Sequence, residues 1–236
     1  MIMVALATSG VRAAERGPLL DQEGPTFEQD DPTPIPDGPA DTGLPAEICD
    51  ESQLVEGVQL PENPDLYTVF NENAAWGTPR MVQTLIAVSE EMAWRFPEIQ
   101  PLVVGDISRE GGGAFPPHRS HRGGIDVDLG LYTRGGKQGR GGFLTLPAEE
   151  LDLDMNLAFV QALFATGNVE RILLDRSLIK ALRDHAIQTG AMTEDDARRM
   201  FILPEEAMER PFGMDQIVHH VQGHENHFHV RVYCSD

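Results

Sequence analysis

Residues 120–131 read Ser-His-Arg-Gly-Gly-Ile-Asp-Val-Asp-Leu-Gly-Leu, and this stretch is the clearest guide to the fold. From residue 125 onward, apolar side chains alternate with Asp126, Asp128 and Gly130. Strict alternation is typical of a strand with one apolar face, because successive side chains point to opposite sides of a strand. The pattern therefore predicts a strand over 125–131 that buries one face and directs both aspartates to the other.

Outward from this strand, the pattern predicts helices and further strands. Thr78 suits a helix N-cap, Pro79 suits the first turn, an apolar stripe follows at helical spacing, and the helix should end before Pro97. Other patterns predict strands over 102–104, 169–174 and 228–233, and helices over 154–165, 177–188 and 194–201. The order predicts an α+β fold, with a mainly antiparallel central sheet flanked by helices.

The front of the chain differs in composition from the rest. Residues 17–45 contain seven prolines and few apolar anchors, so they bury too little surface to offset the entropy lost on ordering. We predict a clipped signal peptide over 1–16, an acidic Pro-rich linker over 17–55 and a folded domain over 56–236. The alternative for the first segment is a short disordered leader. No apolar run approaches the roughly twenty residues that span a bilayer.

The charge of the chain restricts its partners. The sequence holds 38 acidic and 18 basic side chains, a formal net charge of −20, and residues 17–79 contain fourteen carboxylates without one Lys or Arg. Nucleic acid and anionic membranes would repel such a protein. We therefore expect neither partner.

Seven of the eight histidines fall into two clusters, 118–121 and 219–229. His227 and His229 are two residues apart on a predicted strand, so both leave the same face. In the first cluster, a turn through the glycines at 123 and 124 can bring His121 to Asp128. Two imidazoles and one carboxylate leave a fourth position open on tetrahedral zinc, as in catalytic zinc sites. A structural site more often uses cysteines.

The sequence around these histidines resembles that of penicillin-insensitive murein endopeptidases, a group of zinc peptidases related to lysostaphin-type enzymes and D-Ala-D-Ala carboxypeptidases. The resemblance rests on residues 120–128 and 224–231 and runs from about Trp76 to Cys234, two-thirds of the chain. It implies one Zn²⁺ ion per chain. The residues that it implies are His121, Asp128 and His229 as ligands, His224 and His227 as unliganded catalytic histidines, and His118 near the metal.

Several neighbouring residues have two interpretations. His118 is either a further metal neighbour or a nearby substrate contact or bystander. Ser120, part of the motif, is expected beside the metal ligands or in contact with the substrate. Asp126 is either an acceptor for the N–H of a ligand or simply exposed. Arg231 either binds a substrate carboxylate or forms an ion pair, and we expect the ion pair.

For the remaining histidines and the glycine-rich segment we expect no part in the site. His185 is expected on a helix surface, and His219 and His220 in a loop. Residues 134–142 are expected to form a plain flexible loop.

The resemblance implies hydrolysis, by metal-activated water, of the amide that joins two peptide stems of peptidoglycan. Two alternatives stay open: a D,D-carboxypeptidase or dipeptidase of the same group, and a non-catalytic zinc- or peptidoglycan-binding module. A periplasmic metal scavenger would instead need several equivalent histidine sites. The implied location is periplasmic or otherwise exported, where Cys49 and Cys234 can pair, although two unrelated thiols are the other interpretation. The sequence leaves the oligomeric state open.

Overall fold

The computed structural model describes residues 49–136, 142–207 and 216–234. The chain divides into two units, 1–42 and 43–236, and every described residue belongs to the second. The predicted signal peptide and most of the predicted linker lie outside the described residues. The described part has four α-helices and nine strands, which confirms the α+β class.

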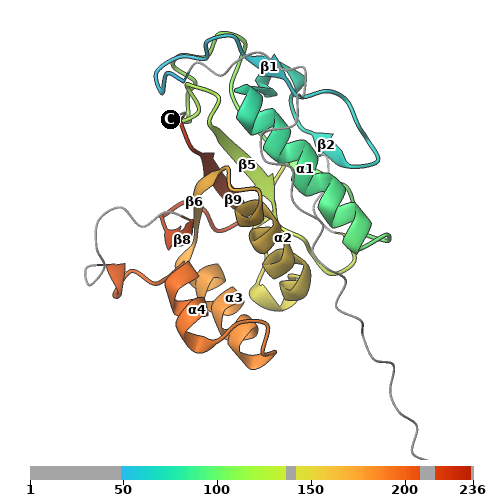
Figure 1. Ribbon diagram of the computed structural model, residues 1–236, viewed down its shortest axis with the longest axis vertical. Coiled ribbons are helices and arrows are strands. Elements are labelled where there is room, and N and C mark those ends of the chain that lie inside the picture. Colours follow the sequence, from blue (N-terminus) through green and yellow to red (C-terminus); the bar gives the residue numbers. More distant parts are fainter. Residues whose placement is uncertain (1–48, 137–141, 208–215, 235–236) are drawn as a thin grey trace, which may run out of the picture. The chain divides into compact units, whose positions relative to one another are not determined.

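Figure 1 shows the helices and strands and labels most of them. The helices are α1 (Pro79–Arg95), α2 (Leu153–Ala165), α3 (Arg176–Gln188) and α4 (Glu194–Met200), with 3-10 turns at Glu72–Ala74 and Ala148–Glu150. The strands are β1 (Val58–Gln59), β2 (Tyr67–Val69), β3 (Trp76–Gly77), β4 (Leu102–Val104), β5 (Asp126–Gly130), β6 (Val169–Leu174), β7 (Phe201–Ile202), β8 (Ile217–His220) and β9 (His227–Val232).

Seven strands form one sheet in the order β2-β4-β5-β9-β6-β8-β7, and β1 pairs with β3 separately. The four central strands, β4, β5, β9 and β6, are antiparallel to their neighbours, as predicted. Both flanks are parallel, because β2 pairs with β4, and β8 with β6 and β7. Parallel neighbours need crossover connections. Predicted helices lie in two of them: α1 follows β2 and precedes β4, and α3 and α4 follow β6 and precede β8.

The helices begin where the sequence predicted capping. The Thr78 hydroxyl accepts a hydrogen bond from the Met81 N–H at 3.2 Å, with Pro79 in the first turn of α1. The stripe of α1 is buried, and the helix ends at Arg95, ahead of Pro97. α2 and α3 each begin one residue earlier than predicted, after the capping residues Asp152 and Asp175.

The helices cover one face of the sheet, as Figure 1 shows for α1 and α2. Phe159 of α2 packs against Phe228 of β9 with ring centroids 5.8 Å apart, and the β5 residues Val127 and Leu129 are fully buried. The alternate residues of β5 and β9 therefore face away from the helices. Those residues are Asp126, Asp128, His227, His229 and Arg231.

The expectation that His219 and His220 lie in a loop was wrong, because both are on β8. β8 has four residues, of which only Val218 is fully buried. An alternation this short carries little signal. The strand forms because it pairs in parallel with β6 on one side and β7 on the other.

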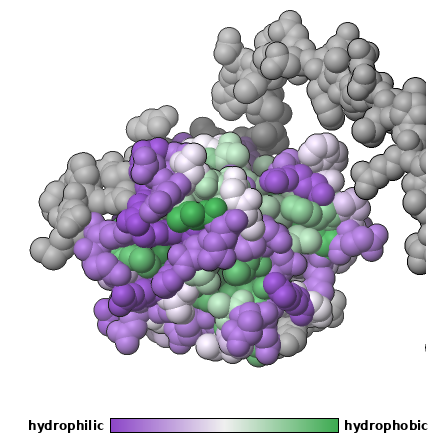
Figure 2. Space-filling view, turned by 90° about the horizontal axis from the view of Figure 1, so that it is seen from below, coloured by the Kyte–Doolittle hydropathy of each residue, from purple (hydrophilic) through white to green (hydrophobic). Residues whose placement is uncertain are grey.

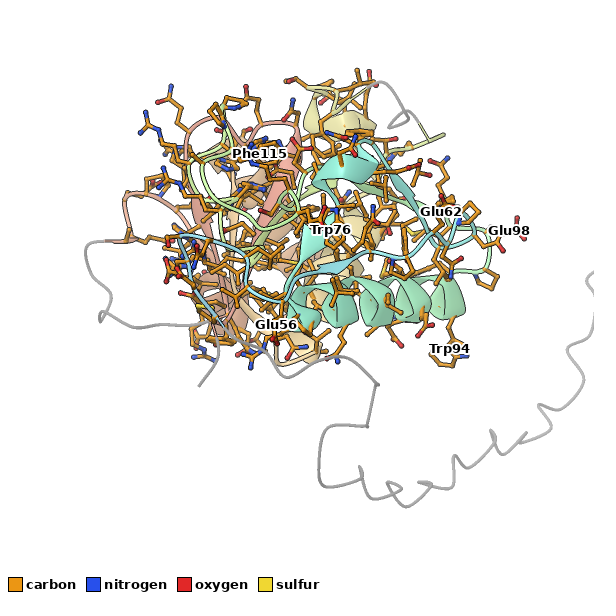
Figure 3. The ribbon with its side chains drawn as sticks, turned by 90° about the horizontal axis from the view of Figure 1, so that it is seen from above. Glu56, Glu62, Trp76, Trp94, Glu98 and Phe115 are labelled. Atoms are coloured by element: carbon orange, nitrogen blue, oxygen red, sulfur yellow. A yellow bond between two sulfur atoms is a disulfide. The ribbon has the colours of Figure 1, made fainter. Side chains whose placement is uncertain are left out.

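The surface offers few large apolar side chains. The face in Figure 2 is mainly hydrophilic, with apolar residues in separate patches. In the described ranges, the exposed large apolar residues are Leu144 and Trp94, and Trp94 projects outward in Figure 3. None of the helices among these residues combines the length and apolarity needed to cross a bilayer.

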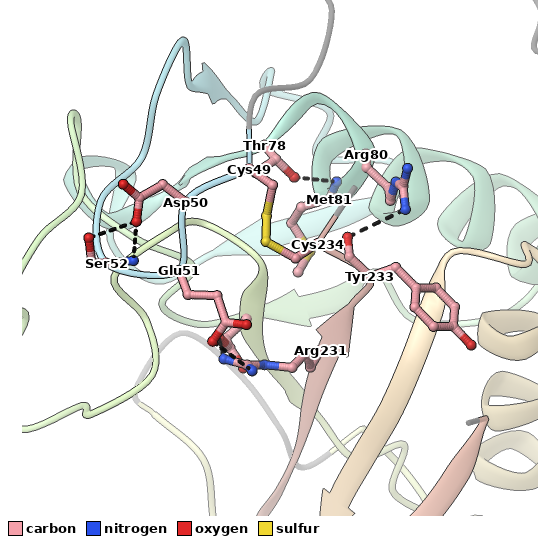
Figure 4. The surroundings of a disulfide bond; sticks show 11 residues. Cys49, Asp50, Glu51, Ser52, Thr78, Arg80, Met81, Arg231, Tyr233 and Cys234 are labelled. Atoms are coloured by element: carbon pink, nitrogen blue, oxygen red, sulfur yellow. Dashed lines mark hydrogen bonds and ion pairs between the residues drawn. A yellow bond between two sulfur atoms is a disulfide. The ribbon is translucent and has the colours of Figure 1, made fainter. Parts of the chain in front are cut away.

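A disulfide joins Cys49 to Cys234, across 185 residues, with Cα atoms 5.3 Å apart (Figure 4). It ties the start of the described chain to the residues that follow β9. Beside it, Arg80 of α1 donates a hydrogen bond to the Tyr233 carbonyl at 3.5 Å, and Arg231 forms an ion pair with Glu51 at 3.4 Å. The predicted pairing is confirmed.

Candidate metal centre

On the face of the sheet that points away from the helices, three side-chain atoms lie at the mutual distances that a tetrahedral metal site needs. His121 Nε2 lies 3.4 Å from Asp128 Oδ1 and 3.4 Å from His229 Nδ1, and the last two atoms are 3.1 Å apart. Ligands bound to zinc at about 2.0–2.1 Å in a tetrahedron are about 3.4 Å from one another. The three atoms thus fit three corners of such a site.

The sheet and one tight turn bring these atoms together. Asp128 and His229 are direct partners in the β5–β9 register. His121 comes from the loop before β5, and the chain turns back through Gly124, which has a positive φ of 68°. A Cβ there would lie 2.9 Å from the Cα of Gly77, so the close approach requires glycine. All three donor side chains are buried.

In each of the two candidate ligand histidines, the ring nitrogen that points away from the centre lies next to a hydrogen-bond acceptor. His121 Nδ1 lies 2.9 Å from the Ile107 carbonyl, and His229 Nε2 lies 2.8 Å from Asp126 Oδ1. A carbonyl or carboxylate oxygen only accepts, so each of these nitrogens carries the proton. In the neutral form of each ring, the other nitrogen has a lone pair directed at the centre, as in metal-bound histidines.

Asp128 Oδ1 is a buried oxygen that receives no well-aligned hydrogen bond from the described residues. Burial alone would raise the pKa of Asp128, but the imidazoles of His121, His227 and His229 around it lower that pKa far below its usual range. A buried carboxylate oxygen without a partner costs stability. A cation between the three donor atoms would remove that cost.

Asp126 and Arg231 support the centre from one side. Arg231 Nε and Nη2 each donate to one Asp126 oxygen at 3.0 Å. Burial raises the pKa of Asp126, yet hydrogen bonds from His229 and Arg231 give a net lowering. Burial lowers the pKa of His229, but Asp126 and Asp128 raise it to about 9. Arg231 thus forms the expected ion pair, and Asp126 is buried instead of exposed.

Two further histidines border the centre. His227 Nε2 lies 3.4 Å from Asp128 Oδ1, and its Nδ1 lies 2.7 Å from the Asn226 side-chain oxygen. His224 Nδ1 lies 3.1 Å from the Val221 carbonyl, and its ring centroid is 5.1 Å from that of His227. Burial lowers the pKa of His224, and the neighbouring His229 and His227 lower it further.

His118 borders the centre from the opposite side. Its Nε2 lies 2.9 Å from Asp106 Oδ2 and its Nδ1 lies 3.6 Å from Asp128 Oδ2. Donor atoms of His118, His121 and Asp128 all lie within 4.8 Å of one another. His121 and Asp128 thus belong to two possible ligand sets, completed by His118 or by His229.

Residues 49–236 match the family model of the penicillin-insensitive murein endopeptidases. The chain belongs to this family. The match extends the resemblance forward from Trp76 to Cys49, so it includes both cysteines of the disulfide. Comparison with curated proteins gave no match.

Sequence reasoning missed three residues beside the centre of this murein endopeptidase family member. Asp106 contacts His118, Asn226 contacts His227, and the Phe143 ring stacks on His227 with centroids 5.1 Å apart. The segment with Asp106 belongs to the resemblance, but a single aspartate has no spacing signal. Phe143 approaches through tertiary packing alone. Ser120 Oγ lies 3.5 Å from His229 Nε2, at the margin of hydrogen bonding.

The other histidines of this family member have contacts of their own. His185 on α3 lies 2.7 Å from Asp154. His220 Nδ1 accepts a hydrogen bond at 2.9 Å from the Arg176 N–H, the first of α3. Burial lowers the pKa of His219, with Arg171 the next cause. Of the glycine-rich loop, residues 137–141 lie outside the described residues.

Proposed function

We propose that this protein is an exported, zinc-dependent murein endopeptidase that hydrolyses the peptide cross-links of peptidoglycan. The observation that carries the proposal is the trio of lone-pair donors, His121 Nε2, Asp128 Oδ1 and His229 Nδ1, at mutual distances of 3.1–3.4 Å. These residues would hold one Zn²⁺ ion, and His118 lies beside them. Nitrogen and oxygen donors in this number suit zinc with one open position.

A bound zinc ion supplies Lewis acidity that lowers the pKa of water and polarises a carbonyl. The chain supplies the proton transfers. His224 donates its Nδ1 proton to a carbonyl, so its Nε2 is the basic atom, and its lowered pKa keeps it neutral near pH 7. We assign it the role of general base.

His227 is the second catalytic histidine of the proposal. Asn226 accepts from its Nδ1, and the stacked Phe143 ring restricts its rotation, so Nε2 is held toward the centre. A protonated Nε2 there would donate to the oxyanion that develops on the scissile carbonyl. Asn226 and Phe143 are positioning residues for this role.

Export and substrate class rest on separate observations. A disulfide between the two ends of the described chain is typical of oxidising compartments. The family description names murein, and peptide stems of murein are therefore the proposed substrate.

The test is mass spectrometry of the products formed from cross-linked dimeric muropeptides, with and without a chelator. We expect chelator-sensitive conversion of dimers to monomers by the wild type and none by His229→Ala. The matched control is His185→Ala, which removes an imidazole outside the centre. Release of only a terminal D-alanine would instead indicate a carboxypeptidase. Unchanged dimers in the presence of bound zinc would contradict the proposal and favour a binding module.

A further inference from the structure

A second concave region lies beside the metal centre, at the β2 edge of the sheet. It is a cavity of about 680 Å³ between the extended segment 59–64 and residues 67–70, with Glu72 at its rim. Every residue that lines it is described by the structure. The metal-centre residues do not line it, so it is a separate feature.

The strand that forms one wall has a free edge among the described strands. Within residues 49–136, 142–207 and 216–234, β2 is the outermost strand of its sheet and pairs with β4 alone. Leu66 accepts from the Leu102 N–H, and the Phe70 N–H donates to Val104, both at 2.9 Å, so these residues turn their backbone groups toward β4. Tyr67 and Val69 alternate with them and turn theirs to the other edge. The Tyr67 N–H donates a hydrogen bond to the Asn63 carbonyl at 3.0 Å, whereas Val69 lines the cavity.

Two contacts between aromatic rings, one tilted and one stacked, connect this cavity with the metal centre. Phe70 lines the cavity, and its ring centroid is 5.0 Å from that of Phe143. Phe143 in turn lies 5.1 Å from His227. Two ring-to-ring steps of this length are spanned by about three residues of extended peptide at ~3.3 Å each. Gly105 permits the arrangement, because a Cβ there would meet the Phe143 ring at 2.8 Å.

The cavity rim is acidic. Glu62 and Glu72 are exposed on it, and the whole of residues 17–79 contains no Lys or Arg. Figure 3 shows Glu62 on one side of Trp76 and, on the other, Phe115, whose ring packs against His118 of the centre. Because Glu62 and Glu72 are negatively charged, a ligand that extends from the centre to this rim meets negative charge there, which favours an ammonium group over a carboxylate.

We propose that the β2 cavity is a subsite for one peptide stem of the substrate, bound in extended form along β2 with a side-chain ammonium of a diamino acid at Glu62 and Glu72. The proposal rests on the proposed function for its substrate class. Backbone pairing with an exposed strand edge gives a peptide affinity, and pockets beside the strand select its side chains. The stem would leave the metal centre past Phe143 and Phe70.

Two variants separate backbone pairing from charge. Val69→Pro removes an N–H on the cavity edge and leaves the pairing with β4 intact, since proline is tolerated at strand edges. Val69→Ala is its matched control, because it keeps the N–H. Glu62→Gln with Glu72→Gln removes the rim charge. Glu56→Gln is the control for charge, because Glu56 lies near the start of α1 in Figure 3, far from Glu62.

Binding is measured by calorimetry on the cleavage-deficient His229→Ala protein, with a soluble monomeric stem peptide whose diamino acid has a free or an acetylated side-chain amine. We expect Val69→Pro and the double glutamine variant each to weaken binding of the free amine about fivefold. Acetylation should weaken binding to His229→Ala similarly and remove the effect of the glutamines. In the cleavage-competent protein, KM should rise about fivefold with kcat and zinc content unchanged.

Equal affinity for the free and acetylated peptides, or an unaltered Kd in both the proline and the glutamine variants, would overturn the subsite. Because the calorimetry needs no cleavage, it is independent of the proposed activity. Stem binding by the His229→Ala protein, together with a wild type that leaves dimers intact, would contradict the endopeptidase and retain the subsite. If Val69→Pro fails to fold, the glutamine variant and the acetylated peptide still decide the question.

Discussion

The polar groups at the centre of the sheet are buried and paired with one another, whereas those at its β2 edge are open to a cavity. At the centre, β5 and β9 hold Asp126, Asp128 and His229 in a buried cluster where side chains restrain one another. At the edge, backbone groups of β2 point toward an open cavity of about 680 Å³. A buried charge needs fixed partners, whereas the backbone N–H and C=O groups of an open edge can form hydrogen bonds with a ligand. Substitutions at the centre should therefore remove chemistry or stability, and substitutions at the edge only affinity.

The largest effect is expected at the centre from Asp128→Asn. The amide lacks the negative charge that would neutralise a bound zinc ion, so on the proposed function zinc affinity and the rate of cross-link cleavage should both fall by at least about 10³-fold. Zinc titration and muropeptide digestion measure the two quantities. The control is Asp154→Asn, an exposed carboxylate on α2, which should keep the rate within about twofold. A fully active Asp128→Asn protein would refute the role of the centre.

Arg231→Met tests whether the centre depends on its supporting ion pair. The change leaves Asp126 buried with one partner fewer, and should lower the free energy of unfolding by about 3–5 kcal/mol. Zinc affinity should fall about 10–100-fold, because Asp126 holds His229. Urea denaturation and zinc titration measure both. Arg176→Met removes an exposed pair with Glu205 and should cost less than about 1 kcal/mol; equal losses in the two variants would contradict the distinction.

Cys49→Ser with Cys234→Ser separates stability from chemistry. Opening a loop of 185 residues should lower the free energy of unfolding by about 2–4 kcal/mol, chiefly through the unfolded chain. The centre keeps its own contacts, so kcat below the unfolding temperature should change by less than about twofold. Thermal unfolding and steady-state kinetics give the two values. A large fall in kcat with little change in stability would show that the disulfide shapes the centre.

On the opposite flank, Glu206→Gln gives a pH-dependent effect. Hydrogen bonds from Arg183 at 2.6 and 3.0 Å lower the pKa of Glu206. This lowering is larger than the rise in pKa that burial causes. A lowered folded pKa means that the stabilisation is complete above the unfolded pKa, about 4.3, and is lost as pH falls through the folded value. The variant should therefore be less stable by about 1–2 kcal/mol at pH 7 and match the wild type well below pH 4. Denaturation at several pH values tests this, and a constant difference would contradict it.

The smallest effect is expected at the β2 edge. Glu62→Gln with Glu72→Gln should leave the free energy of unfolding within about 0.5 kcal/mol of the wild type, since both side chains are exposed. Only KM should rise, about fivefold. Denaturation and kinetics on the same preparation measure both. A loss of stability without a change in KM would mean that the edge is structural, and the contrast with the centre would disappear.

Local sequence signals predicted α1 well, because its cap, its first-turn proline and its apolar stripe are all set by neighbours in the chain. The same holds for β6, which has the predicted bounds. β8 was missed, since its pairing partners are distant in sequence. The parallel flanks and the order of the strands were likewise beyond a local pattern.

By itself, the sequence determined that a strand lies within residues 125–131 with both aspartates on one face, and that His227 and His229 share a face. The period of a strand settles those facts locally. Only the tertiary structure decided that β5 and β9 are neighbours in the register that opposes Asp128 to His229, that Asp106 and Phe143 border the centre, and that β2 has an open edge. Such contacts depend on the packing of the whole sheet, and a local pattern contains no information on which distant strand will be its partner.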